Sequence, residues 1–168
     1  MVDDIPGLRR ILKTNRVIAV VGLSGDWFRP SYFAAKYMLE HGYTVIPVNP
    51  RYQEILGRKC YRSLREAAEN VAVKVDIVDV FRRTEDVMPI AADAIAIGAK
   101  VLWQQLGVKN MEAAGKAEAG GLDTVVDRCV KIEHARLFGG LNWAGVNTRV
   151  ISAKRPQWLP YQQPVRPT

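Results

Sequence analysis

The chain has 168 residues, and its 24 Lys and Arg residues outnumber its 17 Asp and Glu residues, for a formal net charge of +7. This length suits a single domain with one core. No stretch approaches the run of about 18 apolar residues that a membrane span needs, and the N-terminus lacks the apolar centre of a signal peptide. We therefore expect a cytoplasmic protein with no membrane partner.

The pattern of charged, cysteine and histidine residues argues against a nucleic-acid-binding protein, a metalloprotein and an enzyme with a catalytic histidine. Basic residues are dispersed and no nucleic-acid-binding module is recognisable, so we expect no nucleic-acid partner. Cys60 and Cys129 have no CxxC spacing, and no cluster has metal-ligand spacing. His41 and His134 have no evident nucleophile partner. We therefore expect no catalytic residues and no metal.

Helices and strands alternate along the chain. Apolar spacing predicts an amphipathic helix over residues 4–13, and Ser63 with Glu66 has the form of a capping box. Strands are predicted at 17–21, 43–48, 75–81, 101–103 and 123–126, and helices at 30–39, 63–70, 84–97 and 110–120, with further helical turns after 131. These βαβ units predict an α/β fold, a single Rossmann-like doubly wound domain of about five parallel strands flanked by helices. We place this domain at residues 1–155 and a Pro-rich C-terminal tail at 156–168.

The loop after the first strand has the features of a phosphate-binding site. Gly22 and Gly25 permit a tight turn and a close approach of backbone N–H groups to an anion. The positive end of the following helix would face this loop, and Arg29 would add a full charge beside it. We predict that the loop offers a ligand Gly22, Ser24, Gly25, Arg29 and Ser31. An ordinary glycine turn is the alternative.

The end of the second strand discriminates between nucleotides. NAD-binding folds usually place Asp or Glu there, to bind the ribose hydroxyl. This chain has Asn49, Pro50 and Arg51 instead. A neutral amide and a cation favour a ribose that carries a phosphate, as in coenzyme A or NADP. A merely solvated Arg51 is the alternative.

The third and fourth strands end in aromatic and polar residues. Phe81 could stack on adenine beside Arg82, or pack in the core. Trp103 and the amides of Gln104 and Gln105 could line a pocket for an uncharged, pantetheine-like arm, although Trp103 could equally serve packing. Cys129 could lie near the thiol end of such a ligand and form a mixed disulfide with it.

These motifs together resemble a known family. Val-Gly-Leu-Ser at 21–24, Arg-Pro-Ser at 29–31, Val-Asn-Pro at 48–50, Val-Phe-Arg at 80–82, Trp-Gln-Gln-Leu-Gly at 103–107 and Asp-Arg-Cys at 127–129 are similar to those of small stand-alone CoA-binding proteins of bacteria, the YccU-like family. Their domain is similar to the CoA-binding domain of the succinyl-CoA synthetase α subunit. The resemblance covers residues 11–137.

The resemblance implies roles for particular residues. The loop from Ser24 to Ser31, which includes Asp26, Trp27 and Pro30, would hold the CoA phosphates. Asn49, Pro50 and Arg51 would lie near the 3′-phosphorylated ribose, and Val80, Phe81 and Arg82 beside the nucleotide.

The expected function is non-catalytic binding of coenzyme A or an acyl-CoA. Ligase chemistry in the synthetase requires a phosphohistidine domain and an ATP-grasp partner, and this sequence contains neither, so we do not expect a CoA ligase. An NADP-dependent oxidoreductase or NADP sensor is the alternative, because the same fold permits it. A protein-interaction module that uses the basic surface and the Pro-rich tail is a third reading, with no partner identified.

Overall fold

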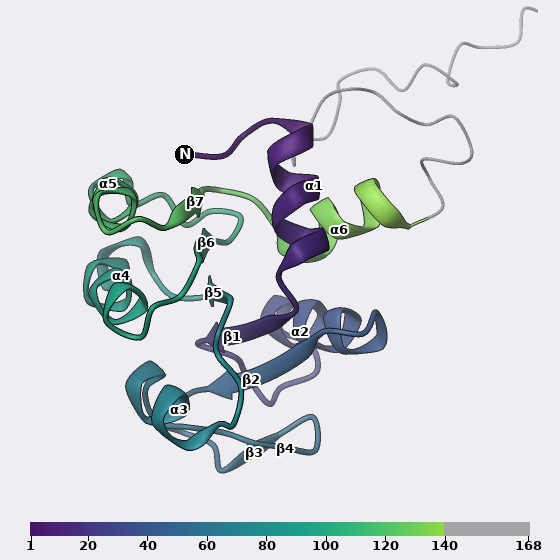
Figure 1. Ribbon diagram of the computed structural model, residues 1–168. Coiled ribbons are helices and arrows are strands. Elements are labelled where there is room, and N and C mark those ends of the chain that lie inside the picture. The colour runs from purple at the N-terminus through teal and green to yellow at the C-terminus, as the bar shows by residue number, and fades with distance from the viewer. Residues whose placement is uncertain (140–168) are drawn as a thin grey trace, which may run out of the picture.

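The computed structural model describes residues 1–139, which fold around one parallel sheet (Figure 1). Its strands are β1 (Val17–Val21), β2 (Thr44–Val48), β5 (Ile77–Val80), β6 (Val101–Gln104) and β7 (Asp123–Val125). Their order is β2-β1-β5-β6-β7, and every neighbouring pair is parallel. The chain reverses its direction of strand addition between β1 and β5, and ligands of such sheets bind at this point. The predicted doubly wound fold is confirmed.

Helices cover both faces of the sheet (Figure 1). They are α1 (Ile5–Thr14), α2 (Pro30–Glu40), α3 (Leu64–Asn70), α4 (Val87–Ala96), α5 (Met111–Ala119) and α6 (Val130–Phe138). Side chains of β5 alternate between the faces, so Ile77 joins a core cluster with α1, α2 and α6, whereas Val78 and Val80 join a second cluster with α3, α4 and α5. The sheet is therefore buried on both sides, which explains its continuous apolar runs.

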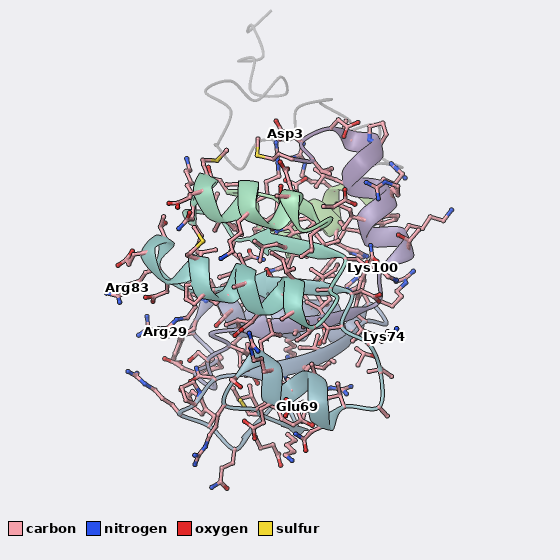
Figure 2. All side chains as sticks on the ribbon, turned by 60° about the vertical axis from the view of Figure 1, so that its left-hand side comes forward. Asp3, Arg29, Glu69, Lys74, Arg83 and Lys100 are labelled. Atoms are coloured by element: carbon pink, nitrogen blue, oxygen red, sulfur yellow. The ribbon has the colours of Figure 1, made fainter. Side chains whose placement is uncertain are left out.

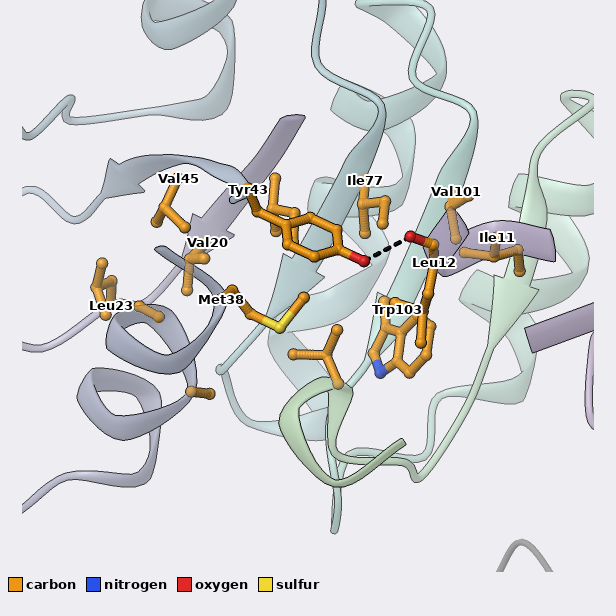
Figure 3. Close-up of a cluster of buried hydrophobic side chains, with 14 of the residues drawn as sticks. Ile11, Leu12, Val20, Leu23, Met38, Tyr43, Val45, Ile77, Val101 and Trp103 are labelled. Carbon is orange, nitrogen blue, oxygen red and sulfur yellow. Dashed lines mark hydrogen bonds between the residues drawn. The ribbon is translucent and has the colours of Figure 1, made fainter. Parts of the chain in front are cut away.

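The amphipathic helix α1 closes the first of these clusters. Its apolar stripe of Leu8, Ile11 and Leu12 is fully buried. The hydroxyl of Tyr43 donates a hydrogen bond to the carbonyl oxygen of Leu12, and the indole of Trp103 lies in the same cluster (Figure 3). The helix predicted at 4–13 is thus confirmed, with a shift of one residue at each end.

Predicted caps set the ends of two helices. The hydroxyl oxygen of Ser63 accepts a hydrogen bond from the backbone N–H of Glu66, and the Asn110 side chain accepts one from Ala113. The capping box is only half formed, because the Glu66 carboxylate accepts from the backbone N–H of Arg62 and not from that of Ser63.

Two features differ from the predicted elements. A small antiparallel hairpin joins β3 (Glu54–Ile55) to β4 (Arg58–Lys59), through a turn in which Leu56 and Gly57 have φ values of 56° and 68°. The helix predicted at 84–97 begins with a separate 3-10 turn, η1 (Thr84–Asp86), and continues as α4. The predicted domain boundary at 155 and the tail at 156–168 lie outside the described residues. No helix within residues 1–139 is long and apolar enough to cross a membrane.

Candidate functional site

One cavity of about 700 Å³ opens at the carboxyl ends of the strands. The loops that follow β1, β2, β5 and β6, together with the start of α6, contribute to its wall. The lining residues are Gly22, Ser24, Asp26, Arg29, Pro30, Ser31, Asn49, Arg51, Tyr52, Phe81, Arg82, Gln105, Leu106, Val108, Cys129 and Ile132. The cavity is formed by the same loops in which the sequence predicts a binding site.

The loop after β1 has a fixed backbone. Gly22 has a φ of +88°, and a Cβ atom there would lie 2.4 Å from the carbonyl oxygen of Phe81. The backbone N–H of Ser24 donates to the hydroxyl of Ser31, and that of Asp26 donates to the hydroxyl of Ser24. These hydrogen bonds tie the glycine loop to the first turn of α2.

The N-terminus of α2 faces the cavity without a side-chain cap. Arg29 occupies the N-cap position but its side chain makes no capping hydrogen bond, and Pro30 is the first helical residue. Pro30 has no N–H and the N–H groups of Tyr32 and Phe33 donate to the carbonyl oxygen of Arg29, so it is the helix dipole that favours an anion here. Figure 2 shows Arg29 and Arg83 at one edge of the molecule and Lys74 and Lys100 at the opposite edge.

Three arginines add positive charge to this half of the cavity. Arg29 contacts Asp26 only at 3.7 Å, and Arg82 pairs with Asp86 at 3.1 Å. Arg51 forms no ion pair within residues 1–139. All three side chains remain exposed. Exposed cations beside an uncapped helix can bind phosphate groups without breaking a buried pair.

Asn49 holds two of these loops together. Its amide nitrogen donates to the carbonyl oxygen of Leu23 at 2.8 Å, and its amide oxygen accepts from the backbone N–H of Arg51 at 3.0 Å. The Tyr52 ring lies 2.8 Å from the position of a Cβ atom at Gly25. A side chain at residue 25 would therefore displace the Tyr52 ring, and the φ of Gly25 is not in the left-handed region.

Among residues 1–139, no cationic side chain lines the other half of the cavity. Its lining consists of Gln105, Leu106, Val108, Cys129 and Ile132. Leu106 is 50% exposed and Ile132 is 37% exposed. Burial raises the pKa of the Cys129 thiol, with a smaller contribution from Asp79, so this thiol is protonated at neutral pH.

A buried carboxyl group lies behind this neutral half. Asp79 is 1% exposed, and its Oδ1 atom accepts a hydrogen bond of 2.6 Å from Nε2 of Gln105. Burial raises the pKa of Asp79 to about 7, although the hydrogen bond acts to lower it.

Six of the residues predicted to form the site do not line the cavity. They are Gly25, Trp27, Pro50, Val80, Trp103 and Gln104. Trp103 is fully buried, and its indole N–H donates to the carbonyl oxygen of Arg128, so it packs in the core as the alternative reading held. Val80 is also fully buried, whereas Trp27 is 62% exposed and its ring packs against that of Phe28 at an angle of 40°.

Sequence reasoning missed Tyr52, Leu106, Val108 and Ile132 as cavity residues. Leu106 lies three residues after the end of the strand predicted at 101–103, so its position was a usable signal. Tyr52 follows a turn at Asn49 and Pro50, in which the backbone N–H of Tyr52 donates to the carbonyl oxygen of Asn49. The Asn-Pro pair predicts this turn but does not predict that the Tyr52 side chain lines the cavity.

Comparison with known proteins identifies the family of this chain. Residues 16–135 match the family model described as "CoA binding domain". An uncharacterized protein of Bacillus subtilis, YneT, is 39% identical over 128 residues, which cover 76% of this chain and 92% of that protein. A solved structure of a hypothetical protein from Pyrococcus horikoshii is 42% identical, with a TM-score of 0.77, and the match covers 82% of this chain and 94% of that one.

Larger enzymes contain a related region. An ADP-forming acetate–CoA ligase of Methanocaldococcus jannaschii is 30% identical over 61 residues, which are 36% of this chain but only 9% of the ligase. The structure of a dinucleotide-forming acetyl-coenzyme A synthetase of Candidatus Korarchaeum cryptofilum is 26% identical with a TM-score of 0.57, and the match covers 66% of this chain and 26% of the synthetase. The length of the family match and the identity to YneT together show that this chain belongs to the CoA binding domain family.

Proposed function

We propose that the protein binds coenzyme A or an acyl-CoA in the cavity at the carboxyl ends of the strands, without catalysing a reaction. The observation that carries this proposal is the division of one cavity into a cationic half and a neutral half. Arg29, Arg51 and Arg82 line the first, and Gln105, Leu106 and Ile132 line the second. Coenzyme A has the same division, since its phosphates are at the nucleotide end and its pantetheine arm is uncharged.

The cationic half suits the nucleotide end of the ligand. The uncapped N-terminus of α2 and Arg29 would bind the diphosphate, and Arg51 would bind the 3′-phosphate of the ribose. Phe81 is only partly buried and lines the cavity, so its ring is available to the adenine. Membership of the CoA binding domain family supports this ligand over NADP.

Isothermal titration of ligand-free protein with CoA, with NADP and NAD as parallel ligands, tests the proposal. We expect CoA to bind and both dinucleotides to bind at least tenfold more weakly, a difference of about 1.4 kcal/mol. Binding of NADP without binding of CoA would refute the proposal and reopen an oxidoreductase or sensor role.

A further inference from the structure

The buried pair of Asp79 and Gln105 has no part in binding phosphates. Asp79 and Gln105 are 1% and 3% exposed, and the hydrogen bond between them is 2.6 Å long. Asp79 lies in the middle of the sheet, in register with Val20 of β1 and Trp103 of β6. A buried polar pair of this kind is costly unless its hydrogen bonds are satisfied, so the orientation of each group matters.

The neighbouring glutamine shows what a purely structural amide does in this fold. Oε1 of Gln104 accepts from the backbone N–H of Asn110 at 2.7 Å, and Nε2 of Gln104 donates to the carbonyl oxygen of Asn110 at 2.9 Å. Both ends of the Gln104 amide are therefore used inside the protein.

Gln105 uses only one end of its amide. Its Nε2 donates to Asp79, and within residues 1–139 its Oε1 accepts no hydrogen bond. Among the described residues, some buried side-chain atoms lack both solvent contact and a hydrogen-bond partner, and the Gln105 Oε1 atom is not one of them. Gln105 lines the cavity. The amide oxygen is thus an unused acceptor at the neutral half of the site.

The protonation state of the Asp79 carboxyl group determines which end of the Gln105 amide is free to bind a ligand. An ionised carboxylate can only accept hydrogen bonds, whereas an amide has a donating and an accepting end. Ionised Asp79 therefore holds the NH₂ group of Gln105 toward itself and leaves the oxygen for another donor.

We propose that Asp79 is a positioning residue, which orients Gln105 so that the amide oxygen accepts a hydrogen bond from an amide N–H of the ligand's uncharged arm. This inference rests on the proposed function and assigns the neutral half of the cavity to the pantetheine arm. It also gives the site a means of distinguishing a pantetheine ligand from a nucleotide that lacks such an arm.

Protonation of Asp79 reverses this orientation. A protonated carboxyl group can donate to Gln105 Oε1, which turns the NH₂ group toward the cavity and removes the acceptor. The pKa of Asp79 near 7 places this change close to neutral pH. Val20 and Trp103 flank Asp79 on the adjoining strands. The charge of Asp79 raises the pKa of Cys129, the titratable group at the start of α6. Asp79 belongs to no ion pair within residues 1–139.

Titrations with CoA and with adenosine 3′,5′-diphosphate test the inference, because the second ligand carries a nucleotide and phosphates but no pantetheine arm. We expect Gln105→Ala to weaken CoA binding about tenfold, the loss of one hydrogen bond, and to leave adenosine 3′,5′-diphosphate binding unchanged. Gln105→Met keeps the side-chain volume and should behave in the same way, which covers the case in which the alanine variant does not fold.

The pH profile separates positioning from a structural role. For the wild type, the ratio of CoA affinity to adenosine 3′,5′-diphosphate affinity, divided by the same ratio for Asp79→Asn, should fall several-fold between pH 8 and pH 6. The ratio cancels titration of the shared 3′-phosphate, and division by the ratio of the variant cancels titration of the 5′-phosphate, which is a monoester only in adenosine 3′,5′-diphosphate. In Asp79→Asn the ratio should follow the titration of that 5′-phosphate alone, because the Asn side chain does not titrate.

Three results would overturn the inference. Equal weakening of both ligands by the Gln105 variants would show a structural role only. A wild-type ratio with the same pH dependence as that of Asp79→Asn would remove the role of Asp79. A wild type that binds adenosine 3′,5′-diphosphate and CoA equally would refute the arm contact but not nucleotide binding. A folded wild type that binds neither ligand would instead refute the proposed function itself.

Discussion

Replacement of Asp79 by Asn should stabilise the protein at alkaline pH and have little effect at acidic pH. The folded protein raises the pKa of this carboxyl from its ordinary value of 3.8 to about 7, because burial penalises its ionised form. Between these pH values the folded state binds more protons than the unfolded state, so the stability of the wild type falls as the pH rises. The Asn side chain keeps an acceptor for Gln105 but carries no proton to lose.

The size of this effect follows from the two pKa values. Each pKa unit corresponds to about 1.36 kcal/mol, so the difference between 3.8 and about 7 corresponds to about 4 kcal/mol. About 3 kcal/mol of this develops between pH 5 and pH 8. Urea unfolding of the wild type and of Asp79→Asn at pH 5, 6, 7 and 8 measures it, as a difference in free energy of unfolding that grows with pH.

Asp76 provides a matched control three residues earlier in the chain. Burial acts to raise its pKa, but hydrogen bonds from Lys100 and from the backbone N–H groups of Arg16 and Val17 bring it below its usual range. The stability that Asp76 contributes is therefore lost only below its ordinary pKa, and the effect of Asp76→Asn should be constant between pH 5 and pH 8. A constant effect for Asp79→Asn over the same range would refute the reasoning about Asp79.

Three further predictions concern Gly22 in the loop after β1, the contact of Arg51 with the ribose phosphate, and the buried His134 on α6. Gly22→Ala should destabilise the protein by about 2 kcal/mol or more, because the added Cβ meets the Phe81 carbonyl oxygen in a left-handed backbone conformation; an unchanged melting temperature would contradict this. Arg51→Ala should weaken CoA binding about tenfold, a loss of about 1.5 kcal/mol, and leave dephospho-CoA binding unchanged; equal losses for both ligands would remove the contact between Arg51 and the 3′-phosphate. Burial, with smaller contributions from His41 and Arg16, lowers the pKa of His134 to about 4. Unfolding free energy should therefore fall as the pH drops from about 6.5 toward 4, because the unfolded state then binds more protons. His134→Gln should lose this part of the acid sensitivity, and a variant with an unaltered pH profile would argue against it.

The fold was largely predictable because its signals are local. The apolar runs of β1 and β5, the proline at the start of α2 and the caps at Ser63 and Asn110 each act within a few residues of sequence. The hairpin of β3 and β4 was not predictable in this way. Its strands have two residues each, which is too short for any alternation of polar and apolar side chains to be recognised.

The sequence predicted which loops form the cavity, but it did not predict which of their side chains point into it. Strand ends indicated which loops meet, and most of the charged and glycine positions at β1, β2 and β5 do line the cavity. The direction of a side chain depends on partners far along the chain. Trp103 turns into the core because the Arg128 carbonyl accepts its N–H, and Asp79 is held by Gln105, which lies 26 residues later. Neither pairing leaves a pattern in a single sequence.

The most direct test of a CoA site at the carboxyl edge of the sheet is a map of backbone amide resonances of ¹⁵N-labelled protein during titration with CoA. Chemical-shift changes are expected at Gly22, Ser24, Arg29, Arg51 and Gln105, with none in the smaller cavity at the opposite edge, which Arg10, Lys100 and Gly121 help to line. Absence of changes in the loop after β1, or changes confined to the opposite edge, would contradict the account.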